Sequence, residues 1–190
     1  NPARYGTFKD AYRNRMVFVY GTAGSAEENE WIYARARYDA ATFGYRGNGS
    51  IEMVADKAFR PEDYPDRNII LFGNEDNNSA WKKVLVTCPV KARNGFVTIG
   101  EKTYKGDDLA FFFIYPRTGS SVASVGIVGG TGLKGMKGGY MNLYFNSGSA
   151  FPDITVFRSD AALKGYDAVV CTGFFDNHWK MSEAEMIWNE

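Results

Sequence analysis

Short apolar runs that end in glycine and a small polar residue recur along the chain. Four of them are Met16 to Tyr20, Asn68 to Phe72, Ala123 to Val128 and Ala168 to Cys171. Such runs, rich in Val, Ile and Phe and closed by a turn residue, are typical of buried strands in an α/β sheet. The pattern therefore predicts at least four strands that share a core.

A helix and a further strand follow the first run. Ser25 and Glu28 have the spacing of a capping box at a helix start. One face of the following helix then carries the apolar residues Ile32, Ala36, Ala40 and Phe43. Gly44 or Gly47 is expected to close this helix, and Ile51 to Ala55 reads as the next strand. This order predicts a βαβ unit with a right-handed crossover.

Two long apolar runs in the middle of the chain are separated by seven residues only, Pro116 to Val122. These runs are Leu109 to Tyr115 and Ala123 to Val128. Because so short a connection cannot contain a crossover helix, they are expected to be antiparallel neighbours. Phe96 to Tyr104 alternates apolar and polar residues, which predicts a short hairpin at the sheet edge.

Further helices are predicted from capping residues. The polar stretch Asn74 to Ser79 precedes a helix that contains Trp81 and is expected to end at Pro89. Ser159 to Lys164 predicts a short helix, and Ser182 to Glu185 repeats the capping-box spacing before a final helix or tail.

The fold expected over residues 1–190 is a single α/β domain of three layers. Its central sheet is mostly parallel but mixed, with helices on both faces, as in Rossmann-like and flavodoxin-like folds. The core is expected to include Val17, Val19, Ile70, Leu71, Phe112, Ile114, Val125, Ile127, Ile154, Val156, Val169 and Val170.

If the strands that end in glycine are parallel, their polar ends meet at one edge of the sheet. Open α/β folds place their ligand crevice at this edge. The residues expected to converge there are Gly21, Thr22, Gly73, Asn74, Gly130, Thr131, Gly132 and Asp176, with Asn74, Glu75 and His178 near the rim. This inference locates a candidate crevice but does not identify a reaction.

Gly130 to Gly135 matches the G-x-G-x-x-G pattern and follows a predicted strand. Glycines in this pattern allow backbone amides to approach a pyrophosphate at a helix start. However, Met136 to Ser149 begins with no strong helix signal, and Asp153 opens its strand instead of ending one. We therefore favour a structural glycine-rich loop over a nucleotide site, and no cofactor is expected.

No set of catalytic residues stands out. His178 is the sole histidine, and neither Gly119 to Ala123 nor Asn146 to Ala150 forms a G-x-S-x-G elbow on a strand-to-helix turn. Glu75 and Asp76 could be paired carboxylates, but a helix cap requires the same residue types. The Cys, His and carboxylate spacings supply no metal-ligand set, so we assign neither a catalytic residue nor a metal ligand.

Composition narrows the classes of partner. Lys plus Arg and Asp plus Glu balance at 22 each, without a basic stripe, which argues against a nucleic-acid partner. No run approaches the roughly 20 apolar residues of a membrane span, so no membrane partner is expected. The aromatic content of 16% fits a stiff core, with a sugar-stacking surface as the less favoured alternative.

The cysteines indicate whether the domain contains a disulfide, and the first residues indicate whether it is a mature protein or a piece of a longer one. Cys88 and Cys171 have no redox or metal spacing, and we favour two buried thiols while a single disulfide stays open. The chain opens with Asn1 and shows no signal peptide, so we expect a mature protein or a piece of a longer one.

Several segments together resemble a known kind of domain. They are VFVYGT, ENEWIYARARYDAATFGYRGNG, DRNIILFGNEDNNSAW, GDDLAFFFIYPR, GGTGLKGM and GFFDNHW, which span about Phe18 to Trp179. In these segments the chain resembles the C-terminal domain of large bacterial proteins whose N-terminal part is an α/β-hydrolase module of the prolyl-oligopeptidase or esterase kind. Such proteins occur in polysaccharide-degrading bacteria.

The resemblance implies a non-catalytic accessory or docking domain in a secreted or periplasmic protein. Its partner would be the N-terminal hydrolase domain of the same chain, which would supply the serine nucleophile, and a small molecule or glycan is a further possible ligand. The alternative from the residues alone is a small stand-alone hydrolase or nucleotide-binding protein that uses the strand-end crevice, with His178 as general base. Fold class does not decide between the two.

Overall fold

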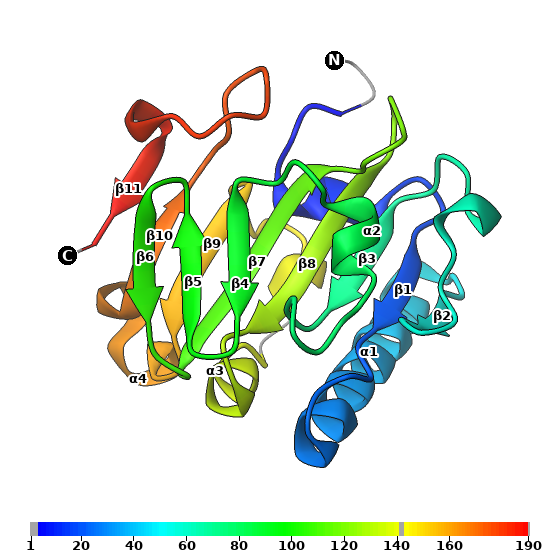
Figure 1. Ribbon diagram of the computed structural model, residues 1–190, viewed down its shortest axis with the longest axis horizontal. Coiled ribbons are helices and arrows are strands. Elements are labelled where there is room, and N and C mark those ends of the chain that lie inside the picture. The colour runs from blue at the N-terminus through cyan, green and yellow to red at the C-terminus, as the bar shows by residue number, and fades with distance from the viewer. Residues whose placement is uncertain (1–3, 141–142, 190) are drawn as a thin grey trace.

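The computed structural model describes residues 4–140 and 143–189, and its main element is an eight-stranded sheet (Figure 1). In spatial order its strands are β11 (Met186–Trp188), β10 (Val169–Gly173), β9 (Ile154–Arg158), β7 (Leu109–Pro116), β8 (Ser124–Gly130), β3 (Ile69–Phe72), β1 (Val17–Tyr20) and β2 (Glu52–Ala55). The apolar runs of the sequence therefore form the middle of one sheet.

The sheet is parallel in one half and antiparallel in the other. The strands β2, β1, β3 and β8 are parallel neighbours, with Val19 opposite Leu71 and Leu71 opposite Ile127. The pairs β8–β7, β7–β9, β9–β10 and β10–β11 are all antiparallel. The predicted βαβ unit and the predicted antiparallel pairing of Leu109 to Tyr115 with Ala123 to Val128 are both confirmed.

One face of the sheet is covered by helices. These are α1 (Ala26–Gly47), the short α3 (Leu133–Gly138) and the 3-10 turns η1 (Phe8–Tyr12) and η3 (Leu143–Phe145). The capping box is confirmed, because the Ser25 side chain accepts the Glu28 amide and the Glu28 carboxylate accepts the Ser25 amide. The helix ends at left-handed Asn48. A buried aromatic cluster that includes Phe8, Phe18, Phe112 and Tyr144 fills this layer.

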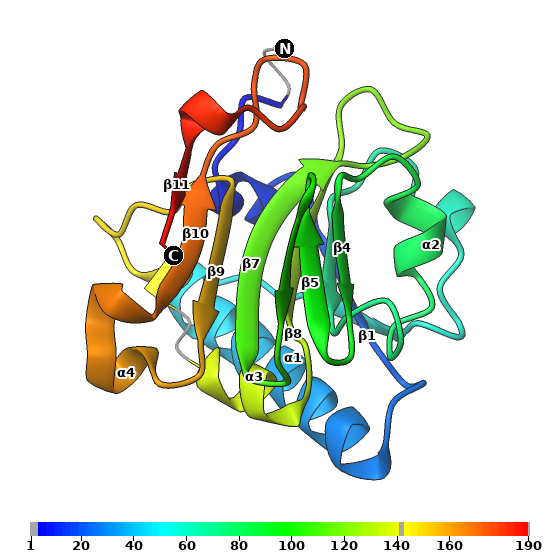
Figure 2. The same ribbon diagram turned by 60° about the vertical axis from the view of Figure 1, so that its left-hand side comes forward.

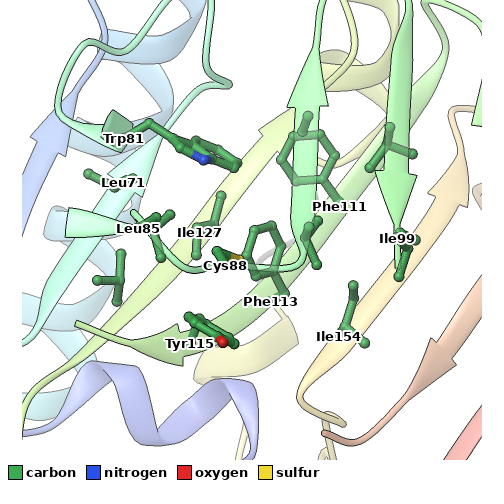
Figure 3. Close-up of a cluster of buried hydrophobic side chains, with 14 of the residues drawn as sticks. Leu71, Trp81, Leu85, Cys88, Ile99, Phe111, Phe113, Tyr115, Ile127 and Ile154 are labelled. Carbon is green, nitrogen blue, oxygen red and sulfur yellow. The ribbon is translucent and has the colours of Figure 1, made fainter. Parts of the chain in front are cut away.

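The opposite face is covered mainly by a second, three-stranded antiparallel sheet. It consists of β4 (Val90–Arg93), β5 (Phe96–Ile99) and β6 (Lys102–Lys105), and the single helical turn α2 (Trp81–Val84) lies beside it (Figure 2). Between the two sheets, Trp81, Phe111 and Phe113 pack with Cys88, Ile99 and Ile127 (Figure 3). The centroids of the Trp81 and Phe113 rings lie 5.8 Å apart.

The prediction of a three-layer Rossmann-like or flavodoxin-like fold with helices on both faces is wrong. The described residues form eleven strands, and α1 is much the longest of the four α-helices. The helix expected around Trp81 is one turn long, and the hairpin expected at the sheet edge joins β4 to form a separate sheet. Alternating side chains give β4 and β5 an apolar face, and this face covers the surface that a helix was expected to cover.

Two further expectations concern the C-terminal part of the chain. The short helix predicted at Ser159 to Lys164 is confirmed as α4 (Ala161–Lys164), which begins at Ala161 and is followed by the 3-10 turn η4 (Gly165–Ala168). Ser182 makes no capping bond, and the 3-10 turn η5 (Glu183–Glu185) leads directly into β11 in place of the expected final helix or tail.

The remaining turn, η2 (Pro61–Asp63), lies in the polar connection between β2 and β3. Of the predicted core residues, Val169 alone is half-buried and the others are buried.

Both cysteines are buried free thiols, as favoured from the sequence. Burial raises the pKa of Cys88 to about 12 and that of Cys171 to about 12, from an ordinary value of 9.0. As the pH rises from 9 towards 12, the unfolded chain loses these thiol protons while the native chain keeps them. The native state then binds more protons than the unfolded state, so the free energy of unfolding falls as pH rises through this window.

We predict that the double variant Cys88→Ala, Cys171→Ala loses stability less steeply than the parent over this alkaline range. Urea unfolding at about pH 8.5 and about pH 11 measures the two slopes. The slope is the informative quantity, because truncation of two buried side chains changes the absolute stability at every pH. Equal slopes in parent and variant would show that the thiols keep ordinary pKa values in the native state.

Candidate functional site

The structure brings most of the predicted crevice residues to one edge of the sheet. Gly21 and Thr22 follow β1, Gly73 and Asn74 follow β3, and Gly130 to Gly132 end β8 and precede α3. Since β1, β3 and β8 are parallel, these residues share the edge at which the strands end. Figure 1 shows this edge at the bottom of the view, beside the start of α1.

Three buried asparagines after β3 connect the strand ends. Asn78 donates from Nδ2 to the carbonyl oxygens of Val19 at 3.0 Å and Phe72 at 2.9 Å. Asn74 donates from its side-chain Nδ2 to the Gly130 carbonyl at 2.9 Å, and its backbone amide donates to Asn77 Oδ1 at 2.7 Å. We call Asn74, Asn77 and Asn78 the asparagine triad. All three side chains are completely buried, and together they join β1, β3 and β8.

Two hydroxyl groups of the crevice are also engaged inside the protein. Thr22 donates from Oγ1 to the buried carboxylate of Asp56 at 2.6 Å, and the other oxygen of Asp56 accepts the Ser79 amide at 2.6 Å. Thr131 accepts the Leu109 amide on its hydroxyl oxygen at 3.2 Å. These contacts tie the ends of β1, β2 and β8 to neighbouring segments.

The rim of this edge is bound to the small sheet. Glu75 is half-buried, and its amide donates to the Ala92 carbonyl in β4 at 2.9 Å. Asp76 accepts bonds from the Arg93 guanidinium and from the Asn94 amide. The bond from Arg93 is the main reason that the pKa of Asp76 lies below its ordinary value. Asp76 therefore serves the contact between the two sheets through its carboxylate, and Glu75 does so through its backbone amide.

The glycines of the G-x-G-x-x-G segment are places of close backbone packing. A Cβ atom on Gly130 would collide with the backbone of α3, and one on Gly135 would collide with the Leu109 carbonyl in β7. A Cβ atom on Gly132 would approach the Asp107 carbonyl at 2.9 Å. These contacts let α3 lie directly on the sheet, which supports the structural interpretation of this pattern. The helix that follows has six residues only.

Behind this edge lies a small cavity of about 20 Å³, lined by residues of α1, β3, β8 and the segment of α3. Arg35 from α1 lines it, and this guanidinium donates to Asp39 at 3.1 Å, to the Tyr144 hydroxyl at 2.6 Å and to the Gly139 carbonyl. The Tyr144 hydroxyl in turn donates to Asp39. Burial, the largest cause, raises the pKa of Tyr144 far above its ordinary value, so this hydroxyl stays protonated. The volume suits about one water molecule.

Asp176 and His178 do not join the other crevice residues. They follow β10, which is antiparallel to β9 and points away from the edge where β1, β3 and β8 end. The prediction that the strand at Ala168 to Cys171 runs parallel to the others is therefore wrong, and its loop lies at the opposite edge, at the top of Figure 1. His178 is exposed there.

The loop after β10 borders a depression of about 270 Å³ that also includes Arg4, Tyr5 and Asp153. Asp153 is buried and accepts the Thr7 amide at 2.6 Å and the Phe175 amide at 3.1 Å. Burial raises the pKa of Asp153, whereas the backbone amides of Lys180 and His178 lower that of Asp176. Asp153 thus closes the contact between the N-terminal segment and the loop, and Asp176 shapes the loop itself.

Sequence reasoning missed the residues that organise the strand-end edge. The sequence predicts helix caps at Asn77 and Asn78 and assigns no role to Asp56. In the structure, Asp56 accepts the Thr22 hydroxyl after β1, Asn77 accepts the Asn74 amide after β3, and Asn78 donates to the Val19 carbonyl in β1. Their signal is the concentration of short amide and carboxylate side chains directly after the strands β2 and β3. Such side chains satisfy backbone groups that a sheet edge leaves unpaired.

Comparison with models of protein families gives no match, and no curated protein matches the sequence. Among residues 4–140 and 143–189, no group of three or more His, Cys, Asp or Glu side chains is arranged to hold a metal ion. Over the same residues, no helix is both long and apolar enough to cross a membrane.

We predict that Asn78→Ala destabilises the protein by about 2–4 kcal/mol, because it removes two buried hydrogen bonds to the Val19 and Phe72 carbonyls and leaves the buried Ala80 amide without its acceptor. Asn177→Ala is the matched control, since this asparagine is exposed in the loop after β10, and it should change stability by less than about 0.5 kcal/mol. Urea unfolding followed by circular dichroism measures both. Equal effects of the two substitutions would show that the asparagine triad does not hold the strand ends.

Proposed function

We propose that this chain is a non-catalytic accessory domain of a secreted bacterial protein that carries an α/β-hydrolase module. The observation that carries the proposal is the engagement of the polar strand-end groups within the domain. Asn74, Asn78 and Thr22 bind the chain's own backbone and side chains at 2.6–3.0 Å. Groups bound in this way hold strands together and are poorly placed to attack or protonate a substrate.

The separation of His178 from this edge supports the same proposal. A general base must lie within hydrogen-bond reach of the group that it deprotonates. His178 is exposed in a loop at the other edge of the sheet, where its backbone amide donates to Asp176 at 2.7 Å. Thr22, Ser25 and Thr131 lie at or beside the strand-end edge and so have no histidine beside them.

The resemblance of the segments between Phe18 and Trp179 supplies the rest of the proposal. From this resemblance we infer a hydrolytic serine in an N-terminal domain of the same protein and a location of the whole protein outside the cytoplasm. On this proposal, the present domain binds that hydrolase domain or a small molecule or glycan near it. The glycines packed against β7 support a structural role for the Gly130 to Gly135 segment over nucleotide binding.

The test is an assay of the 190-residue chain against aryl acetates, short peptides and nucleotides, together with His178→Ala. We expect no turnover above the rate of buffer alone for either protein. Turnover by the parent that disappears in His178→Ala would contradict the proposal, because it would make the domain an enzyme in its own right.

A second arm tests the proposed partner. The full reading frame should encode a G-x-S-x-G module upstream of Asn1, and the full-length protein should hydrolyse an aryl acetate. Substitution of the elbow serine by alanine should abolish this activity, whereas His178→Ala should leave it unchanged. A reading frame that lacks such a module would refute the proposed partner, and loss of activity in His178→Ala would refute the non-catalytic role.

A further inference from the structure

A depression of about 510 Å³ lies where β1 and β2 begin, at the edge of the sheet opposite to the asparagine triad. Three arginines, Arg13, Arg15 and Arg67, contribute to its walls together with Asn14 and Ser50. Phe43 from α1 adds an apolar surface. The site is independent of the function proposed above.

Among the residues that line this depression, the three arginines outnumber the single carboxylate, Glu52. Arg13 pairs with Asp10 at 3.2 Å, and Arg67 pairs with Glu52 at 2.9 Å. The second oxygen of Glu52 accepts the Tyr64 hydroxyl at 2.9 Å, so this carboxylate is fully engaged. Arg15 is exposed, and its guanidinium has no hydrogen-bond or ion-pair partner within the described part of the chain. One arginine charge is therefore left for a ligand.

The backbone at this arginine adopts a conformation that its side chain disfavours. Asn14 and Arg15 have φ angles of 54° and 52°, in the left-handed region. Asparagine tolerates this region, but arginine rarely occurs there, and glycine would fit the turn at a lower conformational cost. Strained residues of this kind concentrate at ligand sites. The turn alone thus gives no reason for an arginine at position 15.

The turn is nevertheless held firmly in place. Arg67 donates from Nε to the Arg15 carbonyl at 2.6 Å, and Asn14 donates from its side chain to the Asp66 carbonyl. The Asn14 carbonyl also accepts the Asn68 amide at 3.5 Å. The Arg15 side chain therefore projects from a fixed backbone, and ordering the loop costs little when a ligand binds.

We infer that this depression binds an oxyanionic group of an organic molecule, with Arg15 as its anchor. A guanidinium presents parallel N–H groups that match the oxygens of phosphate, sulfate or carboxylate. A volume of about 510 Å³ is larger than an inorganic anion needs, so the remainder of the ligand lies against Phe43. The ligand class is a small organic phosphate, sulfate or carboxylate with an apolar portion.

Phenyl phosphate, phenyl sulfate and benzoate are suitable probes, with phenol as the uncharged control. Each is titrated into the 190-residue chain at low ionic strength and followed by ¹H–¹⁵N NMR shifts. We expect saturable shifts of the Asn14, Arg15 and Ser50 amides with at least one charged probe, none with phenol, and weaker binding as NaCl is added. The probe that binds most tightly identifies the oxyanion.

The variant Arg15→Gly separates binding from folding. Glycine adopts a positive φ freely, so this variant should melt at the same temperature as the parent or higher. Its affinity for the best probe should fall at least fivefold, whereas Arg37→Ala, which removes an exposed arginine on α1, should bind like the parent. Absence of saturable shifts with all three charged probes, or a loss below fivefold in Arg15→Gly, would overturn the inference.

Discussion

Buried backbone groups at the ends of β1, β3 and β8 need hydrogen-bond partners, and the asparagine triad provides them. A parallel sheet leaves polar groups unpaired where its strands end, and each unmet group in a dry interior is costly. Asn78 bridges the carbonyls of Val19 and Phe72, and Asn74 reaches the carbonyl of Gly130. The arrangement of the parallel strands thus depends on amide side chains from one short loop.

The same loop couples the two sheets. Asn74 donates to the Asn94 side chain at 2.8 Å, and Asp76 binds Arg93, so the segment that joins the parallel strands also fixes the turn between β4 and β5. This turn positions the small sheet over Phe111 and Phe113. The strand-end edge, which in many α/β proteins is open to a ligand, is used here to join two layers.

The sequence predicted the parallel half of the sheet well and the rest less well. Runs such as Val17 to Tyr20 and Ile69 to Phe72 are apolar at every position and end in glycine, which is a strong local signal of a buried parallel strand. The run at Val169 to Cys171 carries the same signal, but local pattern does not report direction, and it is antiparallel. This error placed Asp176 and His178 at the wrong edge.

Local sequence patterns predicted neither the small sheet that covers the second face nor the depression around Arg15. The prediction of a helix at Trp81 was correct in type, but only one turn forms, and the hairpin after it packs on the sheet through tertiary contacts. Arg15 keeps an uncompensated charge because Glu52, which is distant in sequence, is engaged by Arg67. No spacing rule describes such a site.

Native-state hydrogen exchange of the amides of Gly73, Asn74 and Ala80 tests the central claim most directly. The Gly73 amide donates to the Val128 carbonyl. The amides of Asn74 and Ala80 donate to the side-chain oxygens of Asn77 and Asn78 at the same strand-end edge. We expect these amides to exchange only through global unfolding, with protection equal to that of Leu71 in the middle of β3. Exchange at rates close to those of the exposed loop at Asn177 would show that this edge opens freely, and would contradict the assignment of the asparagine triad to structure.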